Sequence, residues 1–374
     1  MRSLLPVTLL ALSAVVLVVA NGCGDSADRS ASPPAVTGAA GTSGASGAGG
    51  TTTAEPIFCD DSVLAKYTSP PGAGQPPGPS SSAAPGDGAP TQYAIRSYFL
   101  GDTTFDGVPT PNAWKSLGFD LDGFSSDRDF GCHCKAVTRQ AKTDIRTGGM
   151  DGIDNSFGNI IIAQQTIPLN NPSDTASQGI QAGQGSLLIA FSDLGTSPSY
   201  ESVKAQVIPV RMPTGVMPQL TEDDSWSPFA GTTMPAVTYD GGWVTDDTWV
   251  SAPSEATLVV VTLGMKLSIQ RLTITAKLSR DRTRIERGII GGVMETSVFI
   301  DSFRELAASR GLCGDALLSI TEQLRAASDM PTTGAHDPTI PCNAISIGLG
   351  FTATRTGPLG PALAPDTAPS RCGN

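Results

Sequence analysis

The chain has 374 residues, a formal net charge of −11 and only 16% charged residues. This negative balance disfavours nucleic acids as partners, because the long-range field repels phosphate groups. The 42 Gly and 29 Pro residues are typical of an exported, β-rich protein with long loops. Beyond the N-terminal leader, no apolar run reaches the length of about 20 residues that a membrane-spanning helix needs.

Residues 1–22 predict a signal peptide. Arg2 gives the segment a positive start, residues 4–20 form an apolar run too short for a comfortable membrane span, and small residues precede Cys23. The cysteine at the expected cleavage point resembles a bacterial lipobox, in which that thiol receives a diacylglyceryl group. Two neighbouring residues depart from the commonest lipobox pattern, so an ordinary signal peptide stays open as the alternative. We expect lipidation at Cys23 and anchoring in the cell envelope, at the outer membrane, on its periplasmic or surface face.

Composition divides the rest of the chain into four segments. Residues 23–54 are almost entirely small or polar, cannot bury enough apolar surface to fold, and predict a flexible tether. Residues 55–68 form a short apolar island that we expect to dock onto the main body. Residues 69–90, rich in Pro, Gly and Ser, predict a loop that is disordered or partly extended. Residues 91–374 remain as a β-rich globular domain.

Short β-branched and aliphatic runs bounded by turn residues dominate this domain. The expected strands cover residues 93–100, 159–164, 186–191, 203–210, 243–250, 257–263, 267–278, 285–293 and 344–353. The apolar alternation breaks once, between Ile269 and Leu272, where a β-bulge would restore it. Two amphipathic stretches, residues 298–309 and 315–328, predict helices. We therefore expect a mainly β fold, an antiparallel β-sandwich-like domain with two short C-terminal helices.

Two acidic clusters predict a calcium site. Asp120, Asp122 and Gly123 match the third, fifth and sixth positions of a calcium-binding loop. The first position, Gly118, offers no ligand side chain, and no helices flank the loop, so an EF-hand is not expected. A second cluster further along adds oxygen ligands, and the expected set is Asp120, Asp122, Asp129, Asp151, Asp154 and Asn155. Turn capping by these same side chains is the alternative.

Seven cysteines are present. With Cys23 lipidated, six remain, and in an oxidising compartment they predict up to three disulfides among Cys59, Cys132, Cys134, Cys313, Cys342 and Cys372. We expect Cys59 to pair with Cys132 or Cys134. Cys313 would then pair with Cys342, and Cys372 with the cysteine that remains. Zinc binding by the Cys-His-Cys run at 132–134 is disfavoured, because the chain has only one other histidine to complete four ligands.

Catalytic templates are largely missing from the sequence. A nucleophile elbow, a Walker A loop and a zinc-protease helix are absent, and residues 348–353 fit a dinucleotide fingerprint by chance, because too little chain follows. Paired carboxylates such as Asp246 with Asp247 suit glycoside hydrolysis, although solvated pairs are far commoner. Trp226, Trp243 and Trp249 line a sugar-binding surface or, as we favour, lie in the core.

Three strings resemble those of uncharacterised lipoproteins in myxobacteria and related bacteria. They are AWKSLGFDLDG at 113–123, DGIDNSFG at 151–158 and NAISIGLGFTA at 343–353. A Gly- and Ser-rich tether after the lipobox cysteine is also common in such proteins. The resemblance implies export and lipid anchoring, but no activity comes with it and no functional residues carry over.

We expect a lipid-anchored cell-envelope protein that acts as a binding or structural module without catalytic activity. Calcium, which would stabilise the module, is the one cofactor expected. Its expected partners are the membrane, through the lipid, and a glycan or a protein, with nucleic acid disfavoured. The alternative is a hydrolase of envelope polysaccharide that uses the Asp carboxylates.

Overall fold

The computed structural model describes residues 62, 65, 68–125, 134–135, 152–167, 169–230, 236–334 and 337–364. The expected signal peptide, the tether, Cys23 and most of the expected island lie outside this part of the chain.

Antiparallel pairing joins the described strands. They are β1 (Thr91–Phe99), β2 (Ser186–Phe191), β3 (Tyr200–Arg211), β4 (Ser227–Pro228), β5 (Val237–Thr245), β6 (Thr248–Val250), β7 (Leu258–Thr262), β8 (Met265–Leu278), β9 (Arg284–Glu295) and β10 (Ala344–Arg355). Their order is β2-β1-β10-β9-β8-β6-β5-β3-β4, and β7 pairs with β8. The predicted mainly β, antiparallel architecture is thereby confirmed.

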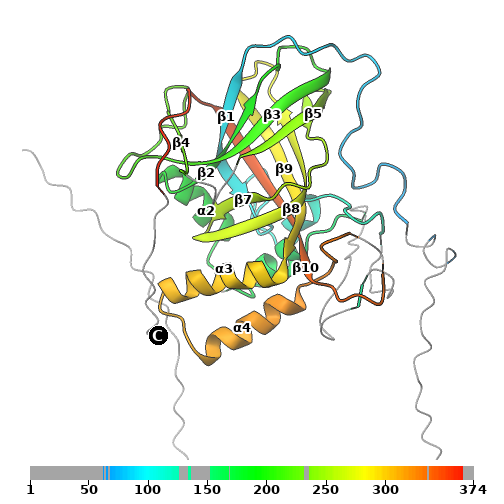
Figure 1. Cartoon of the computed structure of the whole chain (residues 1–374), viewed down its shortest axis with the longest axis vertical. Coiled ribbons are helices and arrows are strands. Elements are labelled where there is room, and N and C mark those ends of the chain that lie inside the picture. The colour runs from blue at the N-terminus through cyan, green and yellow to red at the C-terminus, as the bar shows by residue number, and fades with distance from the viewer. Residues whose placement is uncertain are drawn as a thin grey trace, which may run out of the picture. The chain divides into compact units, whose positions relative to one another are not determined.

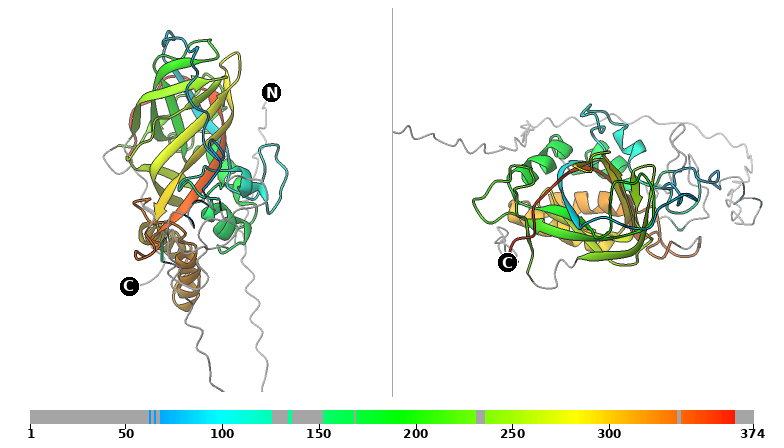
Figure 2. Two further views of the ribbon diagram at one scale, coloured as in Figure 1. Left: turned by 90° about the vertical axis from the view of Figure 1, so that its right-hand side faces the viewer. Right: turned by 90° about the horizontal axis from the view of Figure 1, so that it is seen from above.

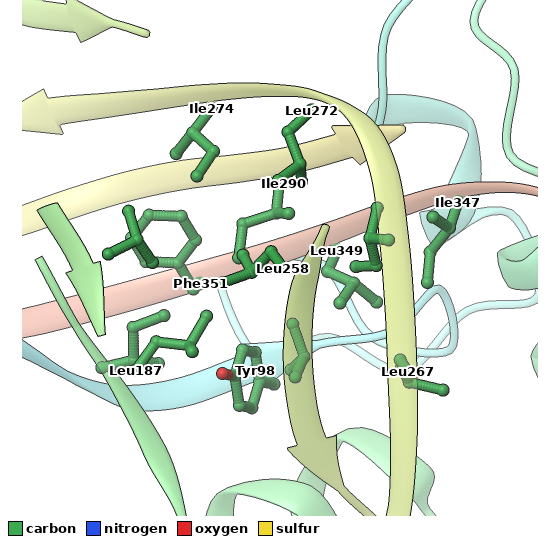
Figure 3. Packing of buried hydrophobic residues seen from close by; sticks show 14 of the residues in the cluster. Tyr98, Leu187, Leu258, Leu267, Leu272, Ile274, Ile290, Ile347, Leu349 and Phe351 are labelled. Atoms are coloured by element: carbon green, nitrogen blue, oxygen red, sulfur yellow. The ribbon is translucent and has the colours of Figure 1, made fainter. Parts of the chain in front are cut away.

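The sheet closes on itself, because β2 pairs with β3 as well as with β1. Viewed from above, it surrounds its own interior (Figure 2, right). Opposed parts of the sheet face each other across one core, which gives the fold its sandwich-like character. Apolar side chains that are at most 1% exposed fill this core (Figure 3), among them Tyr98, Leu187, Leu258, Leu267, Ile290, Ile347 and Phe351. Each such side chain contributes roughly 1.5–3 kcal/mol through burial.

Two helices follow β9, as the sequence predicts: α3 (Thr296–Ser309) and α4 (Asp315–Ala326). They lie at one end of the closed sheet (Figure 1), where Phe299 and Phe303 of α3 join the core. A further helix, α2 (Pro172–Gln181), was not predicted, although a proline in its first turn is a typical start signal. None of the described helices has the length and apolar character needed to cross a membrane.

The run at 159–164, predicted as a strand, belongs instead to a π-helix, η2 (Phe157–Ala163). The prediction was wrong because a short apolar run suits a strand and a buried helix equally well. The N–H of Asn159 donates to the carbonyl of Asn155 at 3.1 Å, and Phe157 packs edge-on against Phe299 of α3. Tertiary packing therefore decided the conformation of this run.

The β-bulge predicted between Ile269 and Leu272 is confirmed. The register of β8 against β9 shifts between Gln270 and Thr273, and Arg271 takes the left-handed backbone conformation with a φ of 51°. Before the bulge β8 pairs with β7, and after it with β6 as well as β9. Bulges re-aim side chains, and Arg271 lines a cavity on the surface of the sheet.

Residues 69–90, predicted to be disordered or partly extended, lie against the sheet and form specific hydrogen bonds with it. The indole N–H of Trp243 donates to the carbonyl of Pro77 at 3.0 Å. The hydroxyl of Tyr200 donates to a carboxylate oxygen of Asp87 at 2.8 Å. The composition was misleading here, because irregular chain can supply carbonyl and carboxylate acceptors without forming helix or strand.

Strand β10 alternates large and small residues. Ile345, Ile347 and Leu349 are fully buried in the core cluster, and Figure 3 shows Ile347 and Leu349 among the packed side chains. The alternate residues are small because other backbone crosses close to that face. A Cβ on Gly348 would lie 2.3 Å from the carbonyl oxygen of Leu117. The glycines of this strand thus allow close packing, which explains them without any dinucleotide-binding role.

Gly348→Ala is expected to destabilise the protein by roughly 1–3 kcal/mol, because the added methyl forces the 117–118 backbone to move. Urea denaturation measures the loss. Gly241→Ala is the matched control, since a Cβ there meets only the Cβ of Ala252, at 3.7 Å. An equal loss in both variants would contradict this account.

Cys134 forms a disulfide with Cys342, 208 positions away, so the expected pairings of Cys313 with Cys342 and of Cys59 with Cys134 were wrong. Lys135 hydrogen-bonds with Ile340 and Cys342, which brings the two sulfurs together.

Cys313 follows α3, whereas the segment before β10 contacts the start of α3, where the N–H of Thr296 donates to the Asn343 carbonyl. The 14-residue helix therefore separates Cys313 from Cys342 by roughly 20 Å. Cys313 is also disulfide-bonded. Cys59, Cys132, Cys372 and both histidines lie outside the described residues.

Candidate metal centre

Two loops distant in sequence lie side by side on the surface of the sheet. An antiparallel bridge joins Phe119 to Asp154, and the N–H of Asp154 donates to the Phe119 carbonyl at 2.9 Å. Phe119 lies directly over β9, where a Cβ on Gly291 would come within 2.4 Å of its ring. Close packing of the first loop on the sheet therefore positions both acidic segments.

This pairing brings three of the expected calcium ligands together. One carboxylate oxygen from each of Asp120, Asp122 and Asp154 lies within 4.8 Å of the others. Because Ca²⁺ binds oxygen at about 2.3–2.6 Å, three oxygens this close can contact a single ion. Asp129 and Asp151, the other expected carboxylates, lie outside the described residues.

Turn capping, the alternative to metal binding, uses one oxygen of each of the same three carboxylates. Asp120 Oδ1 accepts the N–H of Gly123 at 2.6 Å, and Asp122 Oδ1 accepts that of Phe124 at 2.8 Å. Asp154 Oδ2 accepts the N–H of Leu121 at 2.7 Å. The capping bonds hold the three carboxylates in a fixed orientation, so capping and metal binding are compatible.

Asp120 is the most informative member of the cluster. Asp120 is only 4% exposed. Its Oδ2 atom is buried and has no hydrogen bond of normal geometry. Burial, together with the charge of Asp122, raises the pKa of Asp120 to about 6, although a hydrogen bond from Ser69 opposes the rise. A buried carboxylate is costly in its charged form, and a cation offsets that cost.

Asn155 was expected as a ligand, but its amide has another role. Its Oδ1 accepts the N–H of Gly158 at 2.9 Å and that of Gly348 at 3.0 Å. Its Nδ2 donates to the carbonyls of Leu117 at 2.8 Å and Gly348 at 3.1 Å. Because β1 pairs with β10 only as far as Gly350, the amide takes the place of a neighbouring strand at Gly348. Asn155 therefore links the segments 113–123, 151–158 and 343–353 by hydrogen bonds, and its amide is not used by the carboxylate cluster.

Asp329 was not predicted and lies on the same open edge of β10. It is 3% exposed, and its carboxylate accepts the N–H of Ser346 at 2.8 Å and the hydroxyl of Ser346 at 2.5 Å. Burial, with a smaller contribution from the charge of Asp122, raises the pKa of Asp329 to about 7. No local sequence pattern marks Asp329, because its hydrogen-bond partner Ser346 is 17 positions away on strand β10.

A cavity of about 240 Å³ adjoins the cluster and shares Asp120 with it. Trp243, Glu255 and Arg271 also line this cavity. Trp243 is half-buried, whereas Trp226 and Trp249, the other tryptophans considered for a sugar-binding surface, are fully buried in the core.

The paired carboxylates of Asp246 and Asp247 form the turn between β5 and β6. Both residues have a positive φ, 47° and 59°, as the common two-residue hairpin turn requires. Asp247 also forms an ion pair with Arg282 at 2.8 Å. This pair of carboxylates therefore has a structural role.

A scan against protein-family models, a search of the curated proteins and a search of the solved structures each found no match for this chain.

Proposed function

We propose that this chain is a calcium-stabilised, non-catalytic binding module of the cell envelope, anchored to lipid through Cys23. The observation that carries the calcium part is the convergence of Asp120, Asp122 and Asp154 within 4.8 Å, with the Asp120 side chain buried. The sequence of the leader supports the anchor, and the disulfide between Cys134 and Cys342 suits an oxidising compartment.

Calcium is expected to raise the melting temperature of the purified full chain, and EDTA to lower it. The gain in the free energy of unfolding is roughly 3 kcal/mol when free Ca²⁺ exceeds its dissociation constant about 100-fold. Differential scanning calorimetry in millimolar CaCl₂ and in EDTA measures the shift. Magnesium is expected to give a smaller shift, because it demands a stricter octahedral geometry.

Asp120→Asn and Asp154→Asn are expected to abolish the calcium-induced shift, since each removes a charged ligand. Asp223→Asn, on an exposed loop, is the control for loss of one negative charge. The calcium proposal fails if the melting temperature of the wild-type protein is the same in CaCl₂ and EDTA.

One observation favours hydrolysis of envelope polysaccharide as a second function. Asp120 lines a cavity, and a carboxyl with a pKa near 6 suits a general acid. If the protein is such a hydrolase, it releases reducing sugar from envelope polysaccharide, and Asp120→Asn eliminates the release. Absence of release by the wild-type protein leaves the binding module as the function.

A further inference from the structure

The cavity beside the carboxylate cluster has a composition suited to one class of ligand. Its polar and aromatic wall includes Gln75, Asp120, Trp243, Glu255, Arg271 and Thr273. We infer that this cavity binds a pyranose ring of an envelope glycan. The inference names the ligand class of the binding module and rests on that proposed function.

Trp243 supplies the stacking surface. The other tryptophans, Trp114, Trp226 and Trp249, are at most 4% exposed, whereas Trp243 is half-buried and lines the cavity. Its indole N–H already donates to the carbonyl of Pro77, which holds the ring in one orientation. The ring carbons therefore remain for the ligand, and the negative face of an indole attracts the polarised C–H bonds of a sugar ring.

The rest of the wall offers hydrogen-bond acceptors and donors together. Glu255 supplies carboxylate oxygens, and Arg271 supplies guanidinium N–H groups. A sugar hydroxyl both donates and accepts, so it can use both kinds of group. A purely apolar ligand would leave these charges unpaired, and a phosphate would meet the carboxylate of Glu255, so neither fits as well.

The bulge in β8 determines where the side chain of Arg271 lies. Arg271 is the residue in the left-handed conformation within the register shift, and its guanidinium packs on Gly334, where a Cβ would lie 1.9 Å from Nη1. Nη1 is buried and has no hydrogen-bond partner among the residues the structure describes. The absence of a side chain at Gly334 leaves room for the guanidinium of Arg271, which is thereby held where the residue lines the cavity.

The cavity volume limits the occupant to a small unit. About 240 Å³ is below the range of roughly 300–1,000 Å³ typical of sites that enclose drug-sized ligands. A single ring of a longer chain, with the remaining rings in solvent, is consistent with this size. Pro76 and Pro253 complete the rim with further apolar surface.

Isothermal titration of the full chain, with Ca²⁺ present, tests the inference against three probes. These are β-1,4-linked tetramers of N-acetylglucosamine, of glucose and of mannose. At least one is expected to bind, and Trp243→Ala is expected to weaken that binding about tenfold or more. Glu255→Gln, an isosteric change at an exposed residue, is expected to weaken it about fivefold, which provides a second test if Trp243→Ala fails to fold.

Leu318→Ala is the matched control, because Leu318 is 60% exposed on α4 and away from the cavity walls. Its binding is expected to equal that of the wild-type protein. The saccharide inference is overturned if none of the three tetramers binds at millimolar concentration, or if Trp243→Ala and Glu255→Gln both bind as the wild-type protein does. The calcium-induced melting shift is measured on the same samples, so a failure of the glycan site is distinct from a failure of the calcium site.

Discussion

Asn155→Ala is expected to lower the free energy of unfolding by roughly 4 kcal/mol, one of the two largest effects we predict. The substitution removes one amide that serves the backbone of Gly158, Gly348 and Leu117. The backbone groups left behind are buried, and each unsatisfied group costs about 1–3 kcal/mol. Equilibrium urea denaturation, followed by tryptophan fluorescence, measures the loss.

Asn155→Asp separates the hydrogen-bond pattern from the loss of volume. The aspartate keeps the shape and the acceptor, but it replaces the donor that faces the carbonyls of Leu117 and Gly348 with an oxygen. We expect a loss at least as large as that of the alanine variant at neutral pH.

The matched control is Asn343→Ala, because the exposed Asn343 accepts one backbone N–H, from Thr332 at 2.9 Å. Its expected cost is about 1 kcal/mol. If the two alanine variants lose the same stability, the amide of Asn155 does not stand in for a strand.

Regular alternation of apolar residues made most of the fold predictable. Strand β10 and the bulge in β8 both follow from the positions of large side chains, because only one face of each strand meets the core. The π-helix at Phe157–Ala163 did not follow, because its apolar run has no decisive period. Closure of the sheet through β2 and β3 also needs pairings that no local pattern specifies.

The candidate site was only partly predictable, for a related reason. The clustering of acidic residues indicated a cation site, and Asp120, Asp122 and Asp154 do converge. The sequence could not show that the adjacent Asn155 turns its amide toward Gly348. Asp and Asn side chains can bind a cation or hydrogen-bond to a strand edge, and the residue type alone does not distinguish the two roles. Asp329 and Arg271 gain their importance only from non-local neighbours.

In EDTA, the protein is expected to lose stability as the pH rises from about 4 to about 7, chiefly because of Asp329. Its folded pKa of about 7 lies above the ordinary value of 3.8, so in this window the folded state retains a proton that the unfolded state has released. The folded state binds more protons, and its stability therefore falls with rising pH and levels off above pH 7. The full loss from this residue is roughly 4 kcal/mol.

Other carboxyls shape the same profile without reversing it. Asp120, with its pKa raised to about 6 chiefly by burial, contributes a fall of the same sign that ends near pH 6. Hydrogen bonds from Ser279 and Thr283 lower the pKa of Asp281 to about 2, and its opposite contribution lies below pH 4. Urea denaturation at a series of pH values is therefore expected to show a monotonic fall between pH 5 and 7.

Asp329→Asn isolates the contribution of Asp329, because an amide reproduces the neutral acid. Its oxygen accepts the N–H of Ser346, and the Ser346 hydroxyl, which donates to the carboxylate in the native protein, turns so that its oxygen accepts from the amide nitrogen. The variant is expected to be more stable than the wild-type protein above pH 7 and to show a shallower fall, which Asp120 alone produces. Asp301→Asn, whose carboxylate is 71% exposed, should leave the profile unchanged. A wild-type profile that is flat or rising between pH 5 and 7 would show that Asp329 is not held as a neutral acid at the open edge of β10.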